Sequence, residues 1–252
     1  MKIAVCVSGQ PRTWESCYPR WIEILASQGE VDFFFHLWDY NTLPNLLSTV
    51  GDGMKLEDEI ISDDEKTKLI ETLKPKKYLF EPRKNIKYWN CNITDKHQFG
   101  GWTKDQFYSL YYCSLLKRQW ELENDFRYDV VIRIRADLWF LDDFKLNEPA
   151  PRTLYTSHNG WDETYSCYRV GDVFYYADSH TFDQVSEFFK FLSYTPTTYI
   201  VSPDQCPPPE VAMYFYMVNI GILNHPTNIS MKVKRDQRVL QYKGELDEYE
   251  II

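Results

Sequence analysis

The sequence predicts an α/β domain in which a mixed, mostly parallel central sheet is flanked by helices. Three observations lead to this prediction. A short apolar strand near the N-terminus is followed by a glycine-containing loop, a helix and a second apolar strand, which is the order of a βαβ unit. Two capping-box patterns begin later helices. The stretch Tyr128 to Leu141, YDVVIRIRADLWFL, is typical of a buried strand that ends in charge. With 252 residues and 44% hydrophobic side chains, we expect residues 1–252 to form a single domain.

In the first half, apolar runs predict the strands and capping boxes predict the helices. Ser62 with Glu65, and Thr103 with Gln106, have the residue types and spacing of a capping box. The expected elements are strands at Lys2–Val7, Val31–His36, Lys77–Phe80 and Tyr128–Leu141, helices from about Thr13 to Ser27, from Ser62 to near Pro75 and from Thr103 to about Asn124, and loops at Thr42–Ile61 and Arg83–Gly101.

The second half has shorter apolar runs, so we expect shorter elements there. Gly221 is a stop signal for the last helix, because glycine adopts the left-handed conformation that ends helices. The expected elements are strands at Arg152–Thr156, Arg169–Tyr176 and Asn228–Val233, helices at Asp178–Leu192 and Glu210–Asn219, and a proline-rich loop at Tyr194–Pro209.

Composition and charge exclude several classes of protein. The net charge of −9 argues against a general nucleic-acid binder. No apolar run reaches the ~18 residues that a spanning helix needs, and the first ten residues are too short for a signal peptide, so we expect no transmembrane segment and a cytoplasmic location. The six cysteines show no C-x-x-C pair, so a structural zinc site is not expected. Aromatic residues make up 17% of the chain, which fits either core packing or stacking on sugar rings or bases.

The charged end of the stretch Tyr128–Leu141 is the strongest candidate for a site. Side chains alternate along a strand, so Arg133, Arg135 and Asp137 should share one face at its carboxyl end. Charge at that position is costly unless it is paired or binds a ligand. In open α/β sheets, ligands bind beyond the carboxyl ends of the strands. We therefore predict an anion or metal site, with Asp137 as metal ligand; the alternative is a buried structural ion pair of Arg135 with Asp137.

The loop after the first strand is a second candidate. Ser8, Gly9, Gln10 and Arg12 lie between a strand and the start of a helix, where backbone N–H groups favour anions. Glycine lets a ligand approach the backbone, and Arg12 can bind a phosphate with two hydrogen bonds. The alternative is an ordinary strand-to-helix turn with an exposed arginine.

Three further residues are weaker candidates. His36 ends the second strand and could contact a nucleotide or an acceptor hydroxyl, although such a histidine is also typical of a core. Asp172 follows a glycine within a predicted strand, and Glu210 begins a helix. Either carboxylate could act as a general base, while the alternative for Glu210 is an interaction with the helix dipole.

Several segments together resemble small glycosyltransferases of the GT-A type that large viruses, phages and bacterial surface-polysaccharide clusters encode. The matching segments are CVSGQPRTW (Cys6–Trp14), VDFFFHLWD (Val31–Asp39), DQFYSLYYC (Asp105–Cys113), YDVVIRIRADLWF (Tyr128–Phe140), GDVFYYAD (Gly171–Asp178) and PEVAMYFYM (Pro209–Met217). The resemblance implies a GT-A-like, Rossmann-like fold, a nucleotide-sugar donor bound by residues 1–140 and a glycan or other hydroxyl acceptor bound by residues 141–252. It also implies a role in polysaccharide biosynthesis.

The resemblance further implies a divalent cation, Mn²⁺ or Mg²⁺, held by an Asp-x-Asp motif. The matching position here reads Arg135-Ala136-Asp137, with one aspartate instead of two. Either Asp137 holds the cation with help from the diphosphate, or the arginines partly replace the metal. Two other classes stay open: a sulfo- or phosphotransferase with a similar anion loop, and a non-catalytic carbohydrate-binding module.

Overall fold

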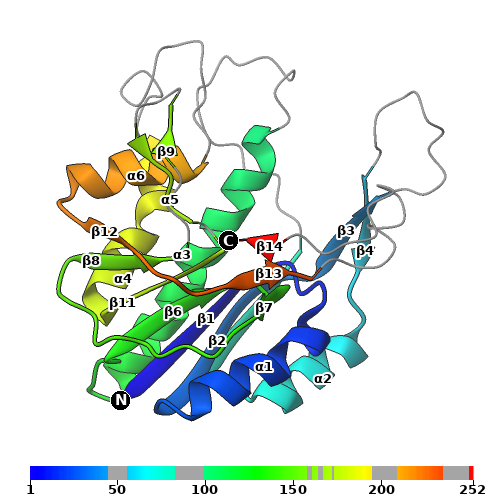
Figure 1. The fold of residues 1–252 in the computed structure, drawn as a ribbon. Helices are drawn as coiled ribbons and strands as arrows, with labels where there is room; N and C mark the ends of the chain where they lie inside the picture. Colours follow the sequence, from blue (N-terminus) through cyan, green and yellow to red (C-terminus); the bar gives the residue numbers. More distant parts are fainter. Residues whose placement is uncertain are drawn as a thin grey trace.

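A seven-stranded sheet forms the centre of the molecule, and helices pack on both of its faces (Figure 1). The computed structural model describes residues 1–44, 56–82, 99–157, 161–163, 167–171, 173–194, 209–234 and 250–251. In spatial order, the sheet consists of β12 (Leu223–Pro226), β8 (Thr153–Thr156), β11 (Phe174–Ala177), β6 (Val130–Ile134), β1 (Lys2–Gly9), β2 (Glu30–Trp38) and β5 (Lys77–Glu81).

The sheet is mixed and mostly parallel, as the sequence predicts. Four of the six pairings between its described strands are parallel, and only β11 runs against its two neighbours. β1 lies between β2 and β6 and is parallel to both. Its residues from Ile3 to Val7 are buried on both faces, which explains the continuous apolar run. Both halves of the chain contribute strands to this one sheet.

Each face of the sheet has its own core and its own helices. One face packs against α1 (Trp14–Ala26) and α2 (Asp63–Leu73). The other face packs against α3 (Phe99–Glu123), together with α4 (Ser179–Ser186), α5 (Phe188–Tyr194) and α6 (Pro209–Asn219). α3 runs opposite to the parallel strands, because Ser109 near its start contacts Gly9 and Glu121 near its end contacts Tyr128. Its first turns therefore lie at the carboxyl ends of the strands.

Three small sheets complete the described structure. They are β7 (Leu138–Phe140) with β13 (Met231–Val233) and β14 (Glu250–Ile251), the hairpin of β3 (Tyr40–Pro44) and β4 (Leu56–Ile60), and the pair β9 (Trp161–Asp162) and β10 (Cys167–Tyr168).

The predicted capping boxes have different outcomes. The Ser62 side chain accepts a hydrogen bond from Glu65 N, and the Glu65 carboxylate accepts one from Ser62 N, so this box is confirmed at the start of α2. The box at Thr103 is wrong, since α3 begins at Phe99 and the pattern lies inside the helix. A cap contributes only ~1 kcal/mol, and the surrounding structure can override so small a preference.

Several predicted elements differ from the structure, and of the strand expected over Arg169–Tyr176 only Phe174–Tyr176 lies in a strand, β11. The strand expected over Tyr128–Leu141 is two strands, β6 and β7, because a turn from Arg135 to Leu138 separates them. The expected loop Thr42–Ile61 contains parts of the β3–β4 hairpin at its ends. The expected helix Asp178–Leu192 is broken at Glu187 into α4 and α5. Most of the loops expected at 83–101 and 194–209 lies outside the described residues. No helix in the described part of the chain has a stretch long and apolar enough to cross a membrane.

A buried ion network ties α3 to α4 at the end of the sheet where β6 begins. Lys117 is completely buried, and its Nζ atom donates to Glu121 Oε2 at 3.0 Å and to Ser179 Oγ at 2.6 Å. Its distance to Asp183 Oδ1 is 2.7 Å. Arg127 adds contacts to Glu121 Oε2 at 3.0 Å and to Asp183 Oδ2 at 2.9 Å. All three ammonium hydrogens of Lys117 therefore have acceptors, which offsets the cost of burying the charge.

We predict that Lys117→Met lowers the free energy of unfolding by about 3–5 kcal/mol, because it removes the buried cation that Glu121 and Asp183 share and leaves them only the more exposed Arg127. Urea denaturation followed by circular dichroism measures the change. Lys68→Met is the matched control, since Lys68 is exposed and pairs with Glu15 only at the surface; its effect should stay below about 1 kcal/mol. Equal losses for the two variants would contradict a structural role for the network.

Candidate anion-binding site

The candidate site lies where the order of the parallel strands reverses. From β1 the chain moves outward through β2 to β5 on one side, whereas β6 pairs with the other side of β1. Such a switch point leaves a crevice outside the carboxyl ends of the two central strands, and open α/β sheets bind their ligands there. The loop after β1 and the turn after β6 meet at this point. These are the two segments in which the sequence predicts a site.

The loop after β1 has an unusual backbone. Gly9 has φ +112° and Arg12 has φ +49°, in the region that side chains other than glycine rarely adopt. A Cβ atom on Gly9 would meet no atom within 4 Å, so backbone conformation and not space requires the glycine. Arg12 is held there by a hydrogen bond from its N–H to Asn41 Oδ1 at 2.7 Å. A left-handed arginine is the kind of local strain that gathers at binding sites.

Asp137 joins the two segments by accepting from two arginines. Its Oδ2 atom lies 2.5 Å from Arg12 Nη1 and 2.8 Å from Arg135 Nη2. The Asp137 side chain is completely buried, whereas those of Arg12 and Arg135 are 27% and 18% exposed. Burial lowers the pKa of the Arg12 guanidinium; the charge of Asp137 raises it again, and the nearby charge of Arg135 lowers it. The Asp137 carboxylate thus holds two positively charged guanidinium groups side by side at the carboxyl ends of β1 and β6.

Arg133 does not share a face with Arg135 and Asp137, contrary to the prediction. The alternation of side chains ends with β6 at Ile134, and the turn that follows redirects the chain. Arg133 lies on the face that α3 covers, is 1% exposed, and its guanidinium carbon is 5.7 Å from the centre of the Tyr175 ring. Of the predicted row of three charges, Arg135 and Asp137 form an ion pair, and Arg133 is buried apart from them.

A divalent cation on Asp137 does not fit this arrangement. One of the two carboxylate oxygens of Asp137, Oδ2, already accepts hydrogen bonds from two guanidinium groups. At an effective dielectric constant of about 20, unit charges ~4 Å apart interact with about 4 kcal/mol, and a divalent ion would be repelled about twice as strongly by each arginine. Within the described residues, no group of three or more His, Cys, Asp or Glu side chains is placed to hold a metal ion.

Ser109 supports the loop from the α3 face. Gly9 N–H donates to Ser109 Oγ at 2.8 Å, and the Ser109 hydroxyl donates to the carbonyl oxygen of His36 at 2.6 Å. His36 Nδ1 lies 2.9 Å from the same Oγ, and His36 Nε2 lies 3.0 Å from Glu81 Oε2. The His36 ring is thus held between the hydroxyl of Ser109 and the carboxylate of Glu81.

This trio is a support and not a nucleophilic triad. Ser109 and His36 are completely buried, so neither can reach a substrate. His36, which the sequence suggests as a ligand contact, instead bonds within the protein through both ring nitrogens. Ser109 and Glu81 are functional candidates that the sequence does not indicate, since neither belongs to a recognisable motif.

The other predicted residues lie as follows. Ser8 is 2% exposed and faces α3, and Gln10 Oε1 accepts from Arg12 Nε at 3.4 Å. Glu210 is partly buried in the first turn of α6, and its carbonyl oxygen accepts from Val170 N at 3.2 Å. Asp172 lies outside the described residues. Its neighbour Val173 accepts a hydrogen bond from Arg135 N at 3.3 Å, which brings the start of β11 to the site.

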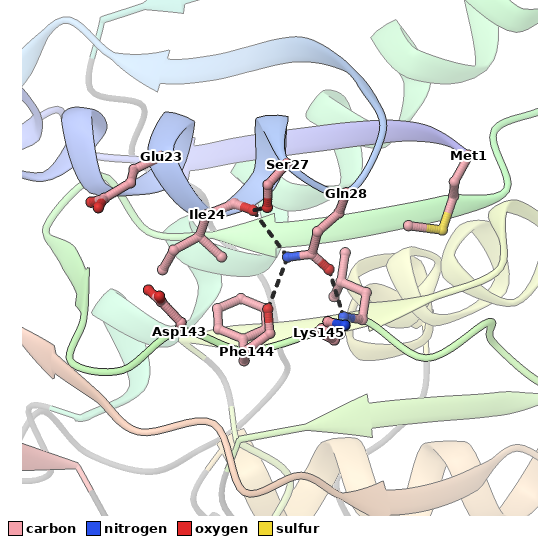
Figure 2. Close-up of a pocket in the computed structure, with 9 residues that line it drawn as sticks. Met1, Glu23, Ile24, Ser27, Gln28, Asp143, Phe144 and Lys145 are labelled. Carbon is pink, nitrogen blue, oxygen red and sulfur yellow. Dashed lines mark hydrogen bonds between the residues drawn. The ribbon is translucent and has the colours of Figure 1, made fainter.

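A groove among the described residues lies elsewhere. It measures about 630 Å³ and lies at the opposite end of the sheet, between the end of α1 and residues 143–146 (Figure 2). Gln28 crosses it, donating to Ile24 O at 3.1 Å and Phe144 O at 3.0 Å and accepting from Leu146 N at 2.7 Å. Its acidic side chains, Glu23 and Asp143, both pair with Arg20. The groove brings together no set of groups suited to chemistry.

Comparisons with known proteins identify no family. No family model matches this chain, and no curated protein matches it. The function is therefore inferred from the geometry at the carboxyl ends of β1 and β6.

We predict that Ser109→Ala lowers the free energy of unfolding by about 1–3 kcal/mol, since it removes the acceptor of the Gly9 N–H group and a hydrogen-bond partner of the buried His36 ring. Urea denaturation measures the loss. Leu122→Ala on the same helix is the control, because Leu122 is exposed and its removal should change stability by less than about 0.5 kcal/mol. A loss no larger than that of the control would show that the loop does not depend on Ser109.

The Cys17 thiol on α1 makes the stability of the folded protein depend on pH. Burial raises the pKa of the Cys17 thiol from its ordinary value to about 11; the charge of Asp137 raises it too, while a hydrogen bond with Ser16 lowers it. Because the folded state holds the proton more tightly, the contribution to stability is present below about pH 9 and is lost as the pH rises towards 11. Between pH 8 and 10.5 we expect the wild type to lose about 2 kcal/mol more than Cys17→Ala. Denaturant midpoints at both pH values measure this, and parallel losses would contradict it.

Proposed function

We propose that the chain is a glycosyltransferase that moves a sugar from a nucleoside-diphosphate donor to a hydroxyl group of a glycan or other acceptor. One observation carries the proposal: Asp137 holds the guanidinium groups of Arg12 and Arg135 side by side at the switch point between β1 and β6. Paired arginines suit the oxygens of a diphosphate, because each can donate two parallel hydrogen bonds. The mostly parallel sheet and the segments that resemble GT-A enzymes support a GT-A-like arrangement and a role in polysaccharide biosynthesis.

In the proposed reaction, the arginines act on the leaving group. Breaking the bond between the sugar and the diphosphate leaves negative charge on the phosphate oxygens. Fixed positive groups that meet this charge lower the barrier, because they need no reorientation during the reaction. The Gly9 N–H group is already bonded to Ser109, so the side chains of the loop contribute more than this amide does.

The acceptor side of the proposal involves residues 141–252. The start of β11 and the first turn of α6 are joined by the hydrogen bond from Val170 N to Glu210 O. We propose that Asp172 or Glu210 removes the proton of the acceptor hydroxyl as it attacks the sugar, which requires the carboxylate to lie within hydrogen-bonding reach of that hydroxyl.

The test is a screen of UDP-, GDP-, CMP- and dTDP-sugars by thermal shift, followed by turnover assays with the donors that bind. A donor at ~100 times its Kd should add about 2.7 kcal/mol to the free energy of unfolding. Arg135→Ala should lower kcat/KM about 10²- to 10³-fold, because a charge-stabilising donor is lost. Arg20→Ala is the control, since Arg20 pairs with Glu23 and Asp143 at the opposite end of the sheet and its loss should leave turnover unchanged.

Two results would contradict the glycosyltransferase proposal. If no nucleotide sugar raises stability but free glycans do, the protein is a carbohydrate-binding module. If a sulfate or phosphate donor is turned over while nucleotide sugars are not, the anion site serves a sulfo- or phosphotransferase.

A further inference from the structure

We propose that Arg12 and Arg135 take the place of the divalent cation, so that the diphosphate of the donor binds without a metal. This inference rests on the proposed function and specifies how its donor is recognised. It starts from Asp137, whose Oδ2 atom accepts from both arginines at 2.5 Å and 2.8 Å.

The two arginines and Asp137 together carry a positive charge. Two guanidinium groups and one carboxylate have one net positive charge, as a divalent cation on a single carboxylate would. The group formed by Arg12, Arg135 and Asp137 can therefore meet the charge of a diphosphate without a metal. Arginine supplies the positive charge through directed N–H donors instead of open coordination positions.

Burial supports the same assignment. The Asp137 side chain has no exposed surface, whereas both arginines keep part of theirs. A ligand at the mouth of the crevice meets the guanidinium groups first, and the carboxylate lies behind them. If Asp137 bound a metal, its carboxylate oxygen would need to face the bound diphosphate. Asp137 is therefore a positioning residue that orients the two arginines.

The backbone of the loop adds an independent argument. Arg12 holds φ +49°, and its N–H is fixed by Asn41 Oδ1 at 2.7 Å. Thr13 Oγ1 donates to Lys234 O at 2.8 Å, and Lys234 N donates to Asp137 O at 2.7 Å. Loop, turn and the end of β13 are thus joined by hydrogen bonds on both sides of the ion pair. Such preorganisation is expected of charges that act in place of a metal.

The experiment compares binding of UDP, GDP and dTDP by calorimetry in excess chelator and in Mn²⁺ or Mg²⁺, followed by turnover in the same buffers with the donor sugar that the screen identifies. We expect the Kd of the preferred nucleotide in chelator to lie within about twofold of its value with metal, and turnover to persist. Arg135→Lys should weaken binding in chelator at least tenfold, because lysine lacks the planar pair of donors. Arg20→Lys is the matched control and should bind as the wild type does.

Asp137 gives a second test that separates the two roles. If it positions the arginines, Asp137→Asn should weaken nucleotide binding in chelator and with metal by the same factor. If it is a metal ligand, the loss should occur only with metal present. Asp137→Asn changes a buried charge and so costs stability; Arg135→Lys changes a partly exposed position and tests the inference independently.

The outcomes distinguish the inference from the function on which it rests. Tight binding and turnover that disappear in chelator and return with Mn²⁺ would overturn the inference and leave the glycosyltransferase proposal intact. Absence of nucleotide binding under every condition would overturn both.

Discussion

The hydrogen bonds from Arg12 and Arg135 to one buried oxygen of Asp137 are the interaction on which the candidate site depends. They connect the loop after β1 to the turn after β6, two segments more than a hundred residues apart in sequence. Without the carboxylate, two guanidinium groups would repel each other at the end of the sheet. With it, they form a fixed patch of positive charge on a protein whose net charge is −9.

α3 makes two kinds of buried polar contact, with different consequences. Towards the end of the helix, Lys117 is enclosed by acceptors and has no exposed surface, so its network is structural. In the first half of the helix, Ser109 connects the backbone of Gly9 to the pair formed by His36 and Glu81. The helix therefore binds α4 through its last turns and supports the loop of the candidate site through Ser109.

The sequence predicts the fold well because the sheet is central and apolar. Continuous apolar runs identify β1, β2, β5 and β6, and the order of these strands with their helices requires a mostly parallel sheet. β12, with the sequence LNHP, is missed because a polar edge strand has no such signal. The sequence indicates Asp137 and Arg12 as candidate site residues because their signals are local. These signals are charge at the end of a buried strand and an arginine after a glycine-containing loop.

The remaining site residues could not be predicted because their roles depend on contacts distant in sequence. Ser109 matters only because Gly9 and His36 lie beside it in the folded chain. The position of Arg133 is misjudged because the alternation of a strand holds only while the strand continues, and the turn at Arg135 is set by tertiary contacts such as the one with Val173.

The antiparallel strand β11 has a mechanical consequence. It pairs with β6 from Phe174 opposite Ile134 to Ala177 opposite Val131, and it also pairs with β8. The first 140 residues and the last 112 are therefore joined by a continuous hydrogen-bonded sheet and not by a hinge. The two sides of the crevice cannot rotate apart as rigid bodies without breaking this ladder.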